Sequence, residues 1–196
     1  DGGADGEIVL ADAADLTITT EVGGSGGGTI TVEVPILGTA GSVATDVTMT
    51  GGSGAISVED MGTDINDISL TTTGTISLNG TYTTSILSSG NADVGDVTLT
   101  GPVTLAGNTT IDTDSSDGTV GFTSTVDGGN TLTISSGAGT VDFAGNIGAT
   151  TALGDVDINS SSGTGTIDIE QIGDADNAGG IIGTVAIGNS TTTQVE

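Results

Sequence analysis

Two acidic loops hold the side chains best suited to bind a metal ion in this 196-residue chain. The first loop reads DTDSSDG and the second reads GDADNAGG. Their oxygen-bearing residues are Asp112, Asp114 and Asp117 in the first loop and Asp174, Asp176 and Asn177 in the second. Carboxylate and amide oxygens are the ligands that Ca²⁺ prefers, although neither loop has the EF-hand spacing or a closing glutamate. The composition of the loops therefore predicts calcium as the candidate cofactor.

Four more aspartates recur at the start of one short motif. They are Asp15 in DLTI, Asp46 in DVTM, Asp67 in DISL and Asp96 in DVTL. If these motifs stack in register, the carboxylates lie about 5 Å apart, and like charges at that spacing repel one another. Either the side chains point into water and hold Asx-type turns, or cations bridge them. Turn capping is the simpler interpretation, because Asp is common where a strand follows a corner.

Most enzyme mechanisms are excluded by composition. The chain has no histidine, cysteine, lysine or arginine, so the usual pairs of nucleophile and base are absent. A glycosidase needs two carboxylates at a set separation, for which Asp155 with Asp157, or Asp142 with Asp168, are the candidates. We interpret these aspartates as solvated outer positions of strands, and we expect a protein that is not an enzyme.

The net charge of −26 restricts the partners. Nucleic acid and anionic membranes would both be repelled by a chain with no basic side chain. No apolar run approaches the length of a membrane span. A net charge of this size is compatible with an environment that contains divalent cations or salt.

A repeated phrase dominates the sequence. The pattern G-x-[Ile/Val]-x-apolar opens at Gly6, Gly28, Gly54, Gly74, Gly101, Gly118, Gly139 and Gly165. A second phrase of the same alternation follows each copy, as DLTI, DVTM, DISL, DVTL, TTID, TLTI, DVDI and TVAI. Apolar residues alternate with small or polar ones in both phrases, which is the signature of a half-buried strand. The variable filler between the phrases leaves room for a third short strand.

An irregular spacing with a constant strand motif favours a β-solenoid. We predict an all-β protein, a parallel β-solenoid of about eight coils that start near residues 6, 28, 54, 74, 101, 118, 139 and 165. Residues 1–196 would form a single repeat array. The alternative is a tandem β-sandwich, but sandwiches have no reason to repeat one phrase and their cores usually include a large aromatic anchor. Glycine at each phrase start would provide a corner that a side chain would hinder.

Three stretches carry a family resemblance. GTVDFAGNIGATTALGDVDI, VDGGNTLTISSGAGTVDF and GDVTLTGPVTLAGNTTI resemble the β-strand repeats of very large bacterial surface proteins, of the filamentous-haemagglutinin-like and giant adhesin kind. The similarity covers most of residues 66–190. It implies a segment of a longer exported protein that forms an extracellular stalk or fibre for attachment, aggregation or surface coating. It offers no catalytic residue.

We therefore expect an extracellular or cell-surface structural protein that associates with itself, end to end or side by side, and with a cell surface or matrix. A calcium-dependent surface-layer or matrix protein is the alternative. An ice-binding protein and a β-helical glycosidase rank lower. Threonine ladders could order water, and Thr-x-Thr pairs occur at Thr17 and Thr19, Thr29 and Thr31, Thr48 and Thr50, Thr98 and Thr100, and Thr131 and Thr133. The pairs fall on both phrases and are interrupted by DVDI, VGF and VDF, so we expect no single unbroken threonine face.

Overall fold

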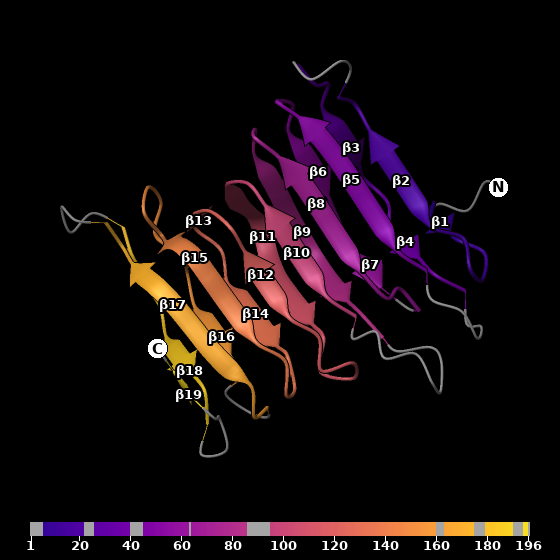
Figure 1. Cartoon of the computed structure of the whole chain (residues 1–196). Coiled ribbons are helices and arrows are strands. Elements are labelled where there is room, and N and C mark those ends of the chain that lie inside the picture. The colour runs from indigo at the N-terminus through magenta and orange to yellow at the C-terminus, as the bar shows by residue number, and fades with distance from the viewer. Residues whose placement is uncertain are drawn as a thin grey trace.

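A computed structural model of the chain describes residues 6–21, 26–39, 45–62, 64–85, 95–159, 163–174, 179–189 and 194–195. These residues form a parallel β-solenoid whose first and last described coils lie at opposite ends of the rod (Figure 1). They contain no helix, and so none that could cross a membrane. The predicted fold class is confirmed. The tandem β-sandwich is wrong, because each strand pairs in parallel with the equivalent strand of the next coil instead of forming antiparallel pairs.

The strands are short and separated by corners. They are β1 (Ile8–Val9), β2 (Leu16–Thr19), β3 (Ile30–Val32), β4 (Ile36–Leu37), β5 (Val47–Gly52), β6 (Ile56–Val58), β7 (Met61–Gly62), β8 (Ile68–Thr72), β9 (Ile76–Thr83), β10 (Val97–Thr100), β11 (Val103–Asp112), β12 (Val120–Phe122), β13 (Val126–Asp127), β14 (Leu132–Ser135), β15 (Val141–Ile147), β16 (Val156–Ile158), β17 (Thr166–Ile172), β18 (Val185–Ile187) and β19 (Gln194–Val195).

The parallel pairings sort these strands into three faces. Face A consists of β2, β5, β8, β10, β12, the first parts of β15 and β17, and β19. Face B consists of β3, β6, the first parts of β9 and β11, β13, and the last parts of β15 and β17. Face C consists of β1, β4, β7, the last parts of β9 and β11, β14, β16 and β18.

Each turn therefore has three sides, and the third short strand for which the filler left room is present. The complete turns are β2 to β4, β5 to β7, β8 to β9, β10 to β11, β12 to β14, β15 to β16 and β17 to β18. The number of complete turns is slightly smaller than the eight coils predicted. The phrase at Gly6 forms only β1, on face C, and so does not begin a complete turn.

The same phrase occupies different faces in the two halves of the rod. The glycine phrases at Gly28, Gly54, Gly74 and Gly101 begin strands of face B, whereas those at Gly118, Gly139 and Gly165 begin strands of face A. The glycine phrase moves from face B to face A after β11, a ten-residue strand that runs through faces B and C. The phrase thus specifies a strand that follows a corner, without specifying which face it joins.

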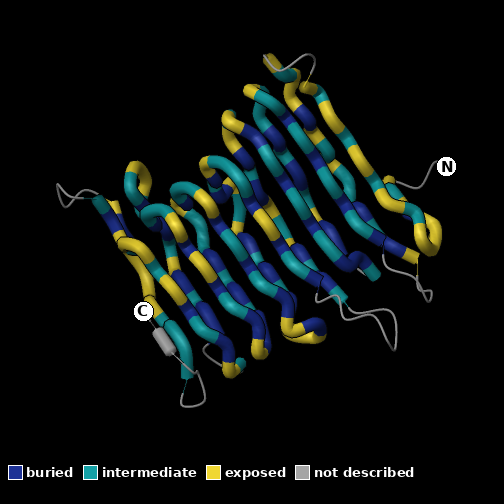
Figure 2. The backbone as a smooth tube through the Cα atoms, in the orientation of Figure 1, coloured by how far each residue is buried: buried dark blue, intermediate teal, exposed yellow. Residues whose placement is uncertain are grey.

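The core is a narrow column of stacked apolar side chains. Buried positions alternate with outward ones along the central strands (Figure 2). On face A, Leu70, Leu99, Phe122 and Phe143 succeed one another in register. The two phenylalanine rings stack with centroids 4.5 Å apart and an interplanar angle of 4°. Such like-on-like stacking explains why a core with so few aromatic residues is sufficient.

Three of the glycines that open the phrases, Gly54, Gly139 and Gly165, are required by close approach of the backbone. A Cβ atom on Gly139 would overlap the carbonyl oxygen of Gly118, and one on Gly165 would overlap that of Gly139. A Cβ on Gly54 would overlap the Gly28 carbonyl oxygen in the same way. None of these glycines has a positive φ angle. The steric contact between consecutive coils, rather than a special turn conformation, therefore selects glycine here.

Candidate functional site

The four motif aspartates form one column on the surface of the rod. The pairings Leu16 with Val47, Val47 with Ile68, and Ile68 with Val97 place the residue before each strand at the same corner of face A. Asp15, Asp46, Asp67 and Asp96 therefore lie on consecutive coils, as the sequence predicted. We call these four residues the aspartate column.

Each carboxylate of the aspartate column accepts a hydrogen bond from the next coil. The backbone N–H groups of Asp46, Asp67, Asp96 and Thr119 donate to Oδ1 of Asp15, Asp46, Asp67 and Asp96, at 3.1, 3.2, 2.7 and 2.7 Å. The side chains thus take the place of a backbone carbonyl at the point where the ladder begins. The capping interpretation is supported, although the capped N–H belongs to the neighbouring coil and not to an Asx turn of the same coil.

The same capping of a backbone N–H by a side-chain oxygen of the preceding coil occurs on face C. The N–H of Thr81 donates to Asp60 Oδ1 at 2.6 Å, that of Thr131 to Asn108 Oδ1 at 3.1 Å, and that of Thr184 to Asp155 Oδ1 at 2.5 Å. In each case the donor residue lies on the following coil, in register with the residue whose side chain accepts the bond. Sequence reasoning missed Asp60 and Asn108, whose only signal is their position directly before an apolar alternation.

We expect the substitution Asp96→Ala to lower the free energy of unfolding by about 2 kcal/mol, because it removes a charge-assisted hydrogen bond and leaves the Thr119 N–H unpaired. Asp96→Asn keeps an acceptor oxygen and removes one of the stacked charges, so we expect a much smaller change. Urea unfolding followed by far-ultraviolet circular dichroism measures both. The matched control is Asp142→Ala on the exposed outer side of β15, with an expected change within about 0.5 kcal/mol. Equal losses for Asp96→Ala and Asp142→Ala would contradict the capping role.

The first predicted calcium loop is held by its own backbone contacts. Asp112 Oδ1 accepts the N–H of Asp114 at 3.1 Å, and Asp117 Oδ1 accepts the N–H of Ala138 on the next coil at 2.7 Å. Oxygens of Asp114 and Asp117 both lie near the point that a Cβ atom on Gly137 would occupy. Within the described ranges no three acidic side chains are grouped so as to hold a metal ion.

The second predicted loop is described only at its start. Asp174 follows β17, whereas Asp176 and Asn177 lie outside the described residues. The loops are also on different turns of the rod, since Asp112 ends β11 and Asp174 comes after β17. Calcium binding at either loop stays a prediction.

The carboxylate pairs considered for glycoside hydrolysis lie on the outer surface. Asp142 and Asp168 are in register on β15 and β17, and both are exposed. Asp157 points outward on β16, while Asp155 caps Thr184. Asp142, Asp157 and Asp168 therefore occupy outer strand positions, as the sequence suggested, whereas Asp155 lies at the corner before β16.

The threonine pairs of face A line up better than the sequence suggested. Two outward rows cross β2, β5, β8 and β10 in register. The first row is Thr17, Thr48, Ser69 and Thr98, and the second is Thr19, Thr50, Thr71 and Thr100. The first row then continues with Gly121, Asp142 and Asp168, so no threonine face extends over the whole rod, as predicted. The alignment over four coils was missed because it depends on which phrases share a face.

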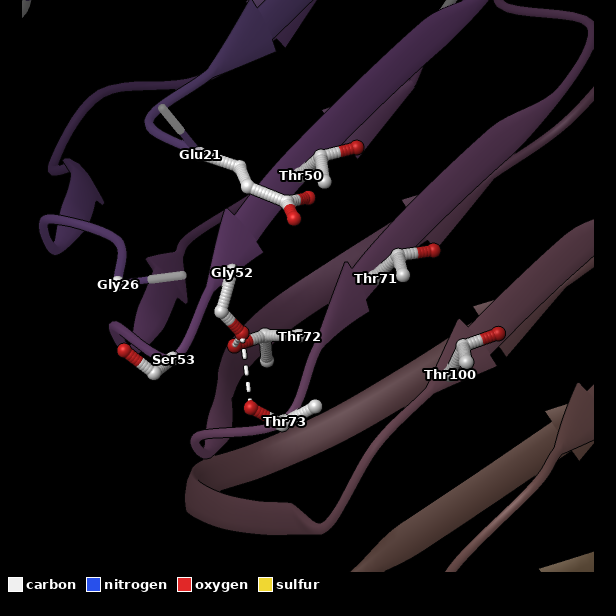
Figure 3. A pocket seen from close by; sticks show the side chains of 9 residues that line it. All are labelled: Glu21, Gly26, Thr50, Gly52, Ser53, Thr71, Thr72, Thr73 and Thr100. Carbon is white, nitrogen blue, oxygen red and sulfur yellow. Dashed lines mark hydrogen bonds between the residues drawn. The ribbon is translucent and has the colours of Figure 1, made fainter. Parts of the chain in front are cut away.

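The second row borders a hollow at the edge of face A (Figure 3). Its volume is about 340 Å³, and it is lined by Glu21, Gly26, Thr50, Gly52, Ser53, Thr71, Thr72, Thr73 and Thr100. We call it the threonine hollow. Six of its nine lining residues carry a hydroxyl group, but carbon atoms form most of its surface, and Glu21 is the one acidic residue among those lining residues.

Comparisons of the chain with known protein families, with characterised proteins and with solved structures find no match.

Proposed function

We propose that this chain is an extracellular structural protein, a stiff acidic solenoid segment that forms part of a stalk, a surface fibre or a self-assembled filament in adhesion or cell-surface coating. The observation that supports this proposal most directly is the continuity of the three ladders. Parallel pairing runs without a break from β1 to β18 on face C and from β2 to β19 on face A. Such a rod transmits load through stacked backbone hydrogen bonds.

The corners reinforce this mechanical role. The aspartate column and the equivalent caps on face C bond consecutive coils outside the regular ladders. Stacked apolar side chains fill the interior behind the same corners. Bending the rod would have to open hydrogen bonds and the core together, so the coils resist bending as a unit.

The two ends of the rod suit association with further coils. Among the described residues, the large apolar side chains that are exposed lie only in the terminal turns. They are Val9, Ile172, Ile182 and Val185, with exposed fractions of 54%, 43%, 77% and 49%. Within the described ranges, β2 and β18 each pair with another strand on one side only. Open edges and exposed apolar groups favour end-to-end stacking, either with a second copy or with adjoining coils.

The acidic surface makes that stacking dependent on cations. Both ends carry the same sign of charge, since the chain has 26 acidic residues and no basic ones. Divalent cations or high salt would screen this repulsion. The absence of lysine and arginine also leaves trypsin-like proteases no cleavage site.

Electron microscopy of the purified chain, with calcium or with a chelator, tests the structural role. We expect single straight rods in chelator and longer end-to-end rods in millimolar calcium. Variants with lysine in place of the exposed Ile182 should remain single rods in calcium, while lysine in place of the outward Thr133 should not change the lengths. Flexible or rounded particles in both conditions would overturn the proposal.

A calcium-dependent surface-layer or matrix protein remains the second candidate, favoured by the approach of Asp114 and Asp117 to one point beside Gly137. We expect calcium to raise the midpoint of thermal unfolding by about 3 °C in differential scanning calorimetry, because a bound ion stabilises the folded state. Sodium chloride at matched ionic strength is the control for screening. If chelator leaves the calcium curve where it was, the calcium proposal fails.

A further inference from the structure

Asn79 is the one asparagine of the chain that precedes a glycine. The chain has nine asparagines, and each of the others is followed by a residue that carries a side chain. Gly80 has no Cβ atom to hinder the approach to its backbone nitrogen, and its φ angle of 106° lies in the left-handed region. An unhindered backbone nitrogen next to an asparagine is the group that attacks the side-chain amide when asparagine is lost from proteins. The pair Asn79 and Gly80 therefore has the chemistry of a deamidation site.

The side-chain amide of Asn79 is also the least restrained of those that the structure describes. It is exposed on β9 and makes no hydrogen bond to any described residue. It lies beside Gly107 of the next coil, where a Cβ atom would overlap Asn79 Oδ1. Every other described asparagine has its side chain in a hydrogen bond, and these are Asn66, Asn108, Asn130, Asn146, Asn159 and Asn189. No such bond holds the amide of Asn79 in one orientation.

The main chain at Asn79 lies outside the regular ladders to both neighbouring coils. Pairing with β6 ends at Leu78, and pairing with β7 is made by Tyr82. Toward β11 the register shifts after Leu78, and the next paired residue is Gly80. The N–H of Asn79 donates instead to Tyr82 Oη at 3.1 Å. This corner between faces B and C can open with the loss of few hydrogen bonds, which is what ring closure between side chain and main chain requires.

We propose that Asn79 is a site of spontaneous deamidation. The backbone nitrogen of Gly80 attacks Cγ of Asn79, a C–N bond forms, and the proton of that nitrogen passes through water to Nδ2. The Cγ–Nδ2 bond breaks, ammonia leaves, and a cyclic succinimide remains. Water then adds to one of its two carbonyl carbons and opens the ring. Addition at Cγ gives aspartate, whereas addition at the backbone carbonyl carbon gives isoaspartate, in which the main chain runs through the former side chain.

Both products change the corner. Each adds a carboxylate next to Gly80, where Asp60 already lies so close that a Cβ atom on Gly80 would overlap its Oδ1. Like charges in such proximity repel one another. Isoaspartate also lengthens the main chain by one carbon atom, directly after the N–H that Tyr82 Oη holds in place. This corner is therefore where chemical ageing weakens the rod, whether or not the rod forms filaments.

Peptide mass spectrometry of the purified chain, incubated for several weeks in mildly alkaline buffer, tests the proposal. Deamidation raises the mass of a peptide by about one dalton. Pepsin is the protease, because the chain has no lysine or arginine for trypsin. Asn108 is the matched internal control, since it is exposed on the next coil and precedes Thr109, which is β-branched and in register with Gly80. We expect the peptide with Asn79 to convert about tenfold faster than the peptide with Asn108, and to give both isoaspartate and aspartate.

Two results would overturn the assignment. They are conversion at Asn79 that is no faster than at Asn108, and an undiminished mass gain of the whole chain in the variant Asn79→Gln. The first comparison is made within the unsubstituted chain, so it does not depend on the folding of a variant. Far-ultraviolet circular dichroism shows whether Asn79→Gln is folded. Rod formation in the microscope is a separate measurement, so the structural role is judged independently.

Discussion

Replacing Gly139 with alanine should lower the free energy of unfolding by about 3 kcal/mol, or prevent folding altogether. The added Cβ would overlap the carbonyl oxygen of Gly118 and approach that of Asp117 at 2.6 Å. Both obstacles are backbone atoms of the coil below, so no side-chain rotation relieves the contact. Relief would require the two coils to separate, which stretches the ladder between β12 and β15 and loosens the stacked phenylalanines. Urea unfolding gives the size of the loss.

The control is Gly121→Ala in the middle of β12, on the same face and in the neighbouring coil. A Cβ on Gly121 meets nothing within 4 Å, and its φ angle is not positive. Alanine there should leave stability unchanged or raise it by a few tenths of a kcal/mol, because it restricts the unfolded chain. Gly129 offers a second open position outside the strand. Losses at Gly121 as large as those at Gly139 would show that close approach of the coils is not what selects glycine.

The solenoid could be predicted because its information is local. The period-two alternation in phrases such as GTVDF determines which side chains point inward, and the inward residues of that phrase, Val141 and Phe143, are indeed buried. The face that a phrase joins is not local. GPVTL begins on face B and GTVGF on face A, although their patterns are alike. The change of face comes after β11, and no feature of the two patterns marks it.

The corner chemistry was predictable only in part for the same reason. The register of the aspartate column follows from its repeated motif, so Asp15 and Asp46 could be placed on consecutive coils. The N–H group that each carboxylate accepts from could not be identified, because it lies on the neighbouring coil. Thr119 is 23 residues from Asp96, and Asp46 is 31 residues from Asp15. The threonine hollow combines Glu21 with residues from three later strands, and no spacing in the sequence indicates that meeting.

The second large effect concerns Tyr82, the single tyrosine of the chain. Its ring is buried on face C, where its Oη–H donates to the Val58 carbonyl oxygen at 2.8 Å and its Oη accepts the N–H of Asn79 at 3.1 Å. Burial raises the pKa of the phenol far above its ordinary value of 10.0, the Asn79 hydrogen bond lowers it in part, and the charges of Asp60 and Glu59 raise it further. The folded protein therefore keeps this proton at a pH where the unfolded chain has lost it.

Stability should consequently fall as the pH rises above 10. Below pH 10 both states hold the proton and the contribution of Tyr82 is complete. Above it the unfolded state binds fewer protons, so the free energy of unfolding decreases by about 1.4 kcal/mol per pH unit, or about 2.7 kcal/mol by pH 12. No lysine, arginine, histidine or cysteine is present to titrate in this window. Urea unfolding at several pH values, with tyrosinate absorbance as the probe of ionisation, measures the slope.

Tyr82→Phe separates this linkage from general alkaline damage. The variant loses the hydrogen bonds to Val58 and Asn79, so it should be less stable by about 1 to 2 kcal/mol at neutral pH. Its stability should nevertheless be constant between pH 10 and 12, because no buried phenol remains to be ionised on unfolding. A variant that declines as steeply as the unsubstituted chain would assign the pH dependence to the backbone or to the acidic surface instead. If the stability of Tyr82→Phe does not change between pH 10 and 12, the loss of stability at alkaline pH is due to the phenol proton of Tyr82. All other ionisable side chains of the chain are carboxylates, which are already ionised in this range.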